Sequence, residues 1–241
     1  AWGGPTLFSE RYRGRLKGIE RADSVTLDAH KQLYVPMGAG LVLFKDPATL
    51  SSIEHHAQYI IRQGSKDLGS HTLEGSRPGM AMLVHSALQI IGRRGYQLLI
   101  DQGIEKAAAF AEMIQADEQF ELITAPELNI LTYRWRPSEV QGLLEGGACD
   151  AKSQLNALLN RSTRYIQKTQ REHGRAFVSR TSLTPECYQG QTTVVFRVVL
   201  ANPLTTLEVL RDLLEEQRLI STDSGLAECI GEMRQLVADS L

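Results

Sequence analysis

The sequence predicts an α/β protein, because short strand-like segments alternate with long helical ones. Residues 24–27 and 41–44 are brief runs of β-branched and apolar residues, which are typical of strands. Residues 78–114 instead repeat apolar side chains at i, i+3 and i+4, which is typical of a helix. The chain has 241 residues, of which 42% are hydrophobic and 22% are charged, an ordinary globular composition.

Charge and composition argue against several classes of partner. The formal net charge of −2 provides no basic field for a nucleic acid. No apolar run approaches the roughly 20 residues that cross a bilayer. The three cysteines, Cys149, Cys187 and Cys229, lie far apart and lack metal-ligand spacing. We therefore expect reduced thiols in a cytoplasmic protein, with no metal site and no contact with nucleic acid or membrane.

Two domains are expected, one over residues 1–115 and one over 116–241. The chain opens on Ala1-Trp2-Gly3-Gly4, an apolar and glycine-rich start that resembles the interior of a domain. We expect an N-terminal part of the first domain to be missing, cleaved or supplied as another chain.

The first domain is expected to hold two strands and two helices. Strand 24–27 leads through a break at 36–40 into strand 41–44, whose continuous apolar run suits a strand covered on both faces. Residues 48–75 form a long connection, and such connections are usually functional or mobile. The helical pattern of 78–114 is interrupted between Gly92 and Gly95.

The second domain is expected to be an antiparallel sheet backed by helices. Its alternating or β-branched segments predict strands, and its longer amphipathic segments predict helices. The predicted strands are 120–123, 130–135, 176–179 and 192–200, and the predicted helices are 151–170, 204–219 and 228–241.

Two segments resemble one enzyme family. The stretch 22–46, ADSVTLDAHKQLYVPMGAGLVLFKD, resembles the cofactor-lysine segment of the group II pyridoxal-phosphate decarboxylases, with its Ser-x-x-x-Asp/Asn-x-His-Lys pattern. This family includes glutamate, aspartate, aromatic amino-acid and diaminobutyrate decarboxylases. The stretch 196–203, FRVVLANP, resembles a segment near the C-terminus of the glutamate decarboxylase branch. The resemblance covers essentially the whole chain.

The resemblance implies a fold and an assembly. The family has the fold of type I pyridoxal-phosphate enzymes, a large α/β domain with a mostly parallel sheet and a small C-terminal α/β domain. This chain would carry the C-terminal part of the large domain and the whole small domain. The active site would lie at a homodimer interface. The family's pyridine-nitrogen and phosphate-binding segments lie upstream of the position of Ala1 and have no counterpart in this sequence.

Three neighbouring residues would serve the cofactor. The resemblance implies that Lys31 holds pyridoxal 5'-phosphate as a Schiff base, which requires an amine that burial or neighbouring charges can make neutral. It implies that His30 contacts the cofactor region and assists proton movements, the alternative being a structural histidine. Asp28 would lie near the phosphate, or would accept backbone N–H groups of the turn.

Two further residues would act on the substrate. The family carries a mobile loop with a tyrosine that protonates the substrate α-carbon. Tyr59 stands in the matching long connection, at nearly the family's distance from Lys31. The alternative is an ordinary surface tyrosine. Arg197 lies among apolar residues and needs a partner. In the family this arginine binds the substrate carboxylate, and an internal salt bridge is the alternative.

We therefore expect a carboxy-lyase that releases CO2 from an L-amino acid, most simply glutamate or aspartate. One alternative is another type I enzyme, such as an aromatic or diaminobutyrate decarboxylase, a carbon–sulfur lyase or an aminotransferase-like protein. An alternative of a different class is a non-catalytic fragment or assembly module that binds no cofactor.

Overall fold

A computed structural model of the chain describes residues 1–57, 59–62, 64, 66–72, 76–146 and 148–240. It divides into two compact units, Ala1–Asp101 and Gln102–Leu241. The predicted domain limit at 115/116 lies at the end of a helix that the unit boundary divides, and it stays a prediction.

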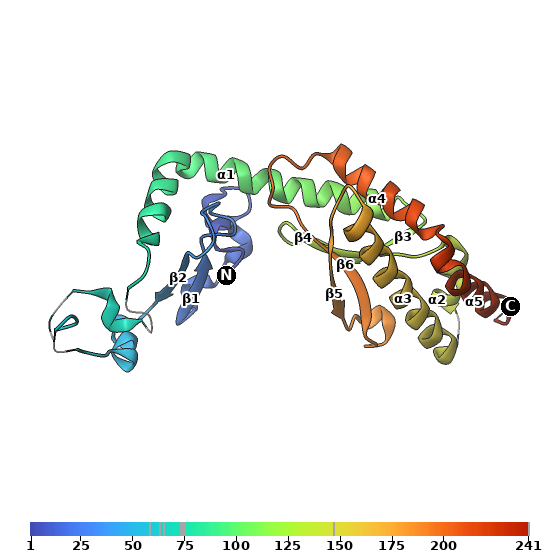
Figure 1. Cartoon of the computed structure of the whole chain (residues 1–241), viewed down its shortest axis with the longest axis horizontal. Coiled ribbons are helices and arrows are strands. Elements are labelled where there is room, and N and C mark those ends of the chain that lie inside the picture. Colours follow the sequence, from blue (N-terminus) through green and yellow to red (C-terminus); the bar gives the residue numbers. More distant parts are fainter. Residues whose placement is uncertain (58, 63, 65, 73–75, 147, 241) are drawn as a thin grey trace. The chain divides into compact units, whose positions relative to one another are not determined.

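The first unit holds a two-stranded antiparallel sheet (Figure 1). Strand β1 (Ser24–Asp28) pairs with β2 (Gly40–Phe44), so that Asp28 stands opposite Gly40. Both strands were predicted. The expectation that β2 is covered on both faces is wrong for this chain, because Val42 and Leu43 are 52% and 54% exposed.

Short 3-10 turns fill the rest of this unit. Before β1 lie η1 (Gly4–Phe8), η2 (Arg13–Leu16) and η3 (Ile19–Arg21). After β2 lie η4 (Pro47–Ile53) and η5 (Leu68–His71), within the long connection that was predicted over 48–75.

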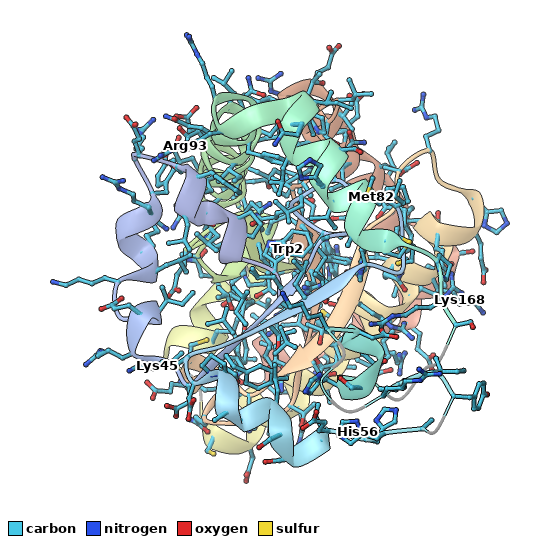
Figure 2. All side chains as sticks on the ribbon, turned by 90° about the vertical axis from the view of Figure 1, so that its left-hand side faces the viewer. Trp2, Lys45, His56, Met82, Arg93 and Lys168 are labelled. Atoms are coloured by element: carbon cyan, nitrogen blue, oxygen red, sulfur yellow. The ribbon has the colours of Figure 1, made fainter. Side chains whose placement is uncertain are left out.

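Helix α1 (Met80–Gln115) follows, and it is broken at Gly92 as its sequence predicts. Gly92 has φ 65° and ψ 169°, a conformation that a residue with a side chain rarely adopts. Apolar side chains on the first part of α1 are exposed, including Met82 (Figure 2) and Ile90.

The second unit is a four-stranded antiparallel sheet with helices packed on one face. Its strands lie in the order β3-β4-β6-β5, and they span Phe120–Thr124 (β3), Ile130–Trp135 (β4), Ser179–Leu183 (β5) and Thr193–Val199 (β6). The helices are α2 (Gln141–Gly146), α3 (Cys149–His173), α4 (Leu207–Ser221) and α5 (Ala227–Ala238), followed in Figure 1 by their labels. The predicted antiparallel sheet is confirmed.

Alternation along the strands separates a core face from a polar face. Tyr133 and Phe196 are fully buried on the core face, where their rings lie 5.1 Å apart. Phe110 from α1 and Leu159 from α3 belong to the same core cluster. On the opposite face, Thr132 of β4 stands beside Arg197 of β6. The sheet therefore presents polar side chains on the face that its core does not use.

Two details of the second unit differ from the prediction. The strand expected at 176–179 begins only at Ser179, and Phe177 before it is exposed. β5 is an edge strand whose polar Ser-Arg-Thr-Ser sequence lacks the apolar signal of a buried strand. Helix α2 was not predicted, because six residues are too few for a recognisable period.

Within the described residues, no helix is both long and apolar enough to cross a membrane.

Candidate active site

Lys31 lies on a closed turn that follows β1. Its backbone N–H donates to the Asp28 carbonyl at 3.1 Å, and its own carbonyl accepts from Tyr34 N–H at 3.1 Å. The N–H of Val35 returns to the carbonyl of Ala29 at 3.2 Å. These local hydrogen bonds fix the backbone on which the amine of Lys31 is mounted.

Buried apolar residues anchor the turn, while its polar side chains stay accessible. Ala29, Leu33 and Val35 are buried. The side chains of Lys31 and His30 are 33% and 25% exposed. The turn therefore presents an amine that a small molecule can reach on a backbone that cannot easily move.

A carboxylate and an imidazole accompany this amine. Lys31 Nζ lies 2.6 Å from Asp28 Oδ2, and His30 Nε2 lies 3.9 Å from the same oxygen. The hydrogen bond from Lys31 holds the pKa of Asp28 below its usual range. His30 Nδ1 lies 3.2 Å from the Ala39 carbonyl, which can only accept, so Nδ1 carries a proton. The structure thus brings three of the predicted residues together.

Tyr59 lies on the connection between β2 and α1, and its side chain is 79% exposed. Within the part of the chain that is described, no hydrogen bond or ion pair joins it to Lys31. Its neighbour Gln58 lies outside the described residues, as do Gln63 and Ser65. The catalytic role of Tyr59 stays a prediction.

Arg197 lies on β6 of the second unit, on the polar face of the sheet. Its backbone stands between Thr132 of β4 and Ser179 of β5, and its carbonyl accepts the Ser179 hydroxyl at 2.7 Å. Its guanidinium makes no hydrogen bond or ion pair with another described residue, so the internal salt bridge considered as an alternative is not seen there. A half-buried guanidinium without a carboxylate is suited to take one from a ligand.

A cavity of about 390 Å³ adjoins Arg197. It lies between the end of β6, the segment before β5 and the start of α4. Most of its lining is apolar, and the lining residues are Arg175, Ala176, Phe177, Val178, Ser179, Arg197, Val198, Val199, Leu200, Thr205, Val209, Leu210 and Leu213. Its volume is in the range of small-molecule sites.

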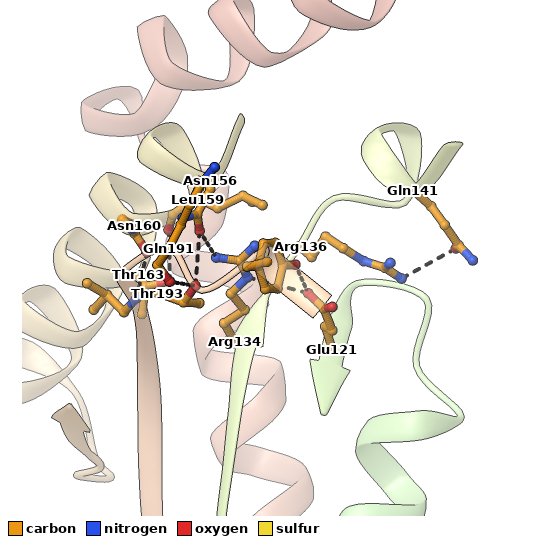
Figure 3. A network of polar contacts seen from close by, with 12 residues as sticks. Glu121, Arg134, Arg136, Gln141, Asn156, Leu159, Asn160, Thr163, Gln191 and Thr193 are labelled. Carbon is orange, nitrogen blue, oxygen red and sulfur yellow. Dashed lines mark hydrogen bonds and ion pairs between the residues drawn. The ribbon is translucent and has the colours of Figure 1, made fainter. Parts of the chain in front are cut away.

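A second buried arginine was missed by the sequence analysis (Figure 3). Arg134 of β4 is fully buried, donates to Asn156 Oδ1 at 2.9 Å and lies 3.4 Å from Glu121 Oε2. The Tyr188 ring stacks on its guanidinium at 4.0 Å, and the Tyr188 hydroxyl donates to Glu121. Burial raises the pKa of Tyr188. Because Tyr188 is joined to Glu121, and Asn156 donates to Gln191 and to the Thr192 carbonyl, we assign the network to packing the 186–191 segment over the sheet.

Two other buried polar residues were also missed. Tyr96 of α1 donates to a carbonyl of the Lys31 turn, and Asn129 makes both backbone and side-chain hydrogen bonds to Leu200 at the end of β6. The sequence carries one signal for Tyr96, because it is a polar residue within an apolar helical stripe. Among the described residues, no group of three or more His, Cys, Asp or Glu could hold a metal ion.

Comparison with known proteins gives a family match. The model of the pyridoxal-dependent decarboxylase conserved domain matches residues 1–136. An aspartate 1-decarboxylase of Aliivibrio fischeri is 62% identical over 227 residues, which are 94% of this chain and 42% of that protein.

Solved structures give the same fold. Mouse CSAD in apo form has a TM-score of 0.76 at 25% identity, over 91% of this chain and 44% of that one. Rice TDC with PLP and tryptamine has a TM-score of 0.69 at 18% identity, over 92% and 40% of the two chains. These likenesses confirm the predicted fold class, that of type I pyridoxal-phosphate enzymes. The chain spans less than half the length of each of these relatives.

Proposed function

The chain belongs to the pyridoxal-dependent decarboxylase family, and we propose that the protein carrying it releases the α-carboxylate of an L-amino acid as CO2, with pyridoxal 5'-phosphate held on Lys31. The Lys31 turn carries this proposal. A single accessible amine stands there on a rigid backbone, within the residues that the family model matches.

The residues of this turn fit an aldehyde cofactor. Covalent attachment needs a primary amine, and Lys31 supplies one. Its Nζ lies 2.6 Å from Asp28 Oδ2, and His30 Nε2 lies 3.9 Å from the same oxygen. Lys31 would hold the cofactor, and His30 and Asp28 would border it. The chemistry that bound pyridoxal phosphate supplies is a sink for the electron pair left when CO2 departs.

The other predicted residues have separate tasks in this proposal. The guanidinium of Arg197 would bind the substrate carboxylate in a bidentate manner, which its lack of a partner within the described residues supports. The phenol of Tyr59 would deliver a proton to the α-carbon and would help to exclude water. The exposed position of Tyr59 suits a group that moves toward its target.

We propose aspartate as the substrate, with β-alanine as the product. The identity of 62% to an aspartate 1-decarboxylase favours it over glutamate. A homodimer in the cytoplasm is also proposed. It is supported by the apolar side chains that the first part of α1 leaves exposed, Met82, Leu83 and Ile90, and by three cysteines that form no disulfide.

The test is reductive trapping of the cofactor on the whole protein. The parent and a Lys31→Ala variant are incubated with pyridoxal phosphate, reduced with borohydride and digested for mass spectrometry. We expect the label on Lys31 in the parent and no label in the variant. CO2 release should follow with aspartate and should be lost in the variant by a factor of at least about 1,000.

Other outcomes would point to the alternatives. A keto acid in place of CO2 would indicate an aminotransferase-like enzyme. Absence of any label on the parent would indicate a non-catalytic module. Faster CO2 release from glutamate or an aromatic amino acid would overturn the choice of aspartate and leave the reaction class in place.

A further inference from the structure

Tyr96 joins helix α1 to the turn that carries Lys31. Its side chain is fully buried, and its hydroxyl donates to the Leu33 carbonyl at 2.9 Å. Its ring stacks on that of Phe8, with centroids 5.4 Å apart and planes 21° apart. A buried hydroxyl that donates one well-formed hydrogen bond is costly to lose, because its partner cannot turn to water instead.

The peptide that Tyr96 contacts is directly connected to Lys31. The carbonyl of Leu33 and the N–H of Tyr34 belong to one peptide unit. Its carbonyl accepts from Tyr96, and its N–H donates to the carbonyl of Lys31 at 3.1 Å. Since a peptide unit is planar and stiff, a hydrogen bond at one end limits movement at the other.

This peptide also needs to be held. Tyr34 has φ 55°, the left-handed region that residues other than glycine seldom occupy. Such conformations persist where the surrounding structure maintains them, and they gather at functional sites. The Tyr96 hydrogen bond falls immediately before the strained residue, which is where it opposes relaxation of the turn.

We infer that Tyr96 is a positioning residue for Lys31: it holds the Leu33–Tyr34 peptide and so fixes the place from which the amine meets the cofactor. This inference rests on the proposed function, because it takes Lys31 as the attachment residue. Burial raises the pKa of Tyr96, so the phenol keeps the proton it donates across the working pH range.

The structure offers a matched control for the experiment. Tyr133 is equally buried, and its hydroxyl donates to Gln217 Oε1 at the same 2.9 Å, in the second unit. Tyr96→Phe and Tyr133→Phe each remove one hydroxyl and keep the ring. Loss of a buried hydrogen bond alone should therefore affect their stability similarly.

Two measurements on the whole protein separate positioning from packing. The first, without cofactor, is hydrogen exchange at the amides of Tyr34 and Val35. The second is the pyridoxal phosphate concentration that gives half-maximal borohydride labelling of Lys31. For Tyr96→Phe we expect faster exchange at both amides and a rise of about tenfold in that concentration, because small displacements of a reacting group are costly. Tyr133→Phe should leave both unchanged.

The inference is overturned if Tyr96→Phe labels Lys31 as readily as Tyr133→Phe does, or if its turn amides exchange at the parental rate. A parent protein that takes no label on Lys31 would be a different result. It would defeat the proposed function, whereas the exchange measurement would still report whether Tyr96 holds the turn.

Discussion

The two units bury their apolar side chains to very different extents. In the second unit the core face of the sheet is closed by helices, and Tyr133, Phe196 and Leu159 are fully buried. In the first unit, β1 and β2 form a hairpin whose Val42 and Leu43 are more than half exposed. The second unit therefore owes its rigidity to a core, and the hairpin owes what rigidity it has to local hydrogen bonds.

The candidate site residues reflect this difference. Lys31 stands on a turn held by its own backbone hydrogen bonds and by that of Tyr96, and its charge is balanced by neighbouring Asp28. Arg197 stands on a strand bonded on both sides, and its charge has no partner within the described residues. A strand within the sheet presents the charge of Arg197 without a counterion from the described residues, whereas a turn places amine and carboxylate together.

The largest expected effect compares one apolar side chain from each unit. Phe196→Ala should lower the free energy of unfolding by about 3–5 kcal/mol, because it empties a fully buried ring position. Leu43→Ala should lower it by less than about 1 kcal/mol, since this side chain is 54% exposed in the chain. Urea unfolding of the 241-residue chain measures both.

Equal losses in the two variants would break the comparison. They would mean that the hairpin of the chain in solution is covered by an apolar surface, and that Leu43 belongs to a core of its own.

A smaller effect is expected where α1 meets the end of β6. A Cβ atom on Gly103 would lie 2.9 Å from the carbonyl oxygen of Leu200, which Asn129 holds through its side chain at 3.1 Å. Since backbone must move to admit the methyl group, Gly103→Ala should cost about 1–2 kcal/mol. It should also raise the substrate KM more than it lowers kcat, because Leu200 follows the strand of Arg197.

Gly231→Ala is the matched control for this substitution. Gly231 also lies within a helix of the second unit, and nothing stands within 4 Å of its Cβ position. Alanine should stabilise α5 by up to about 1 kcal/mol through its helix propensity. If thermal unfolding shows that Gly103→Ala stabilises the protein as Gly231→Ala does, the tight contact of Gly103 does not constrain the protein.

Regular periodicity made most of this fold predictable. An apolar pattern of the right period marks the helices α1, α3 and α4 and the strands β1, β3, β4 and β6. β5 was misplaced because edge strands can be polar, and α2 was missed because it is short. The burial of β2 was predicted wrongly, because an apolar pattern indicates that a segment forms a strand but does not show which elements cover its faces.

The site was predictable where its residues are consecutive in sequence. Asp28, His30 and Lys31 meet because one turn joins them, so a segment match finds all three. Tyr96 reaches the same turn from 63 residues away, and Arg134 finds Asn156 across 22. Such pairs depend on packing between distant elements. A single sequence can show that Tyr96 is a polar residue in an apolar stripe, but it does not show which residue Tyr96 contacts. The roles of Tyr59 and Arg197 stay predictions.

The smallest expected effect concerns the pH at which Asp28 takes up a proton. Its pKa lies below the ordinary value of 3.8, first because Lys31 donates a hydrogen bond to it. A carboxylate whose pKa is lower in the folded state stabilises that state at pH values above about 4, and this contribution is lost as the pH falls through the folded pKa.

Lys31→Met should return the pKa of Asp28 toward 3.8, as measured by carbon NMR of its carboxyl group without cofactor. His30→Gln should shift it far less, because His30 Nε2 lies 3.9 Å from the carboxylate whereas Lys31 Nζ lies at 2.6 Å. If the pKa of Asp28 is unchanged in the Lys31→Met protein, the amine of Lys31 and the carboxylate of Asp28 do not pair in solution. The turn would then carry an uncompensated charge, as β6 does at Arg197, and this contrast between the two units would disappear.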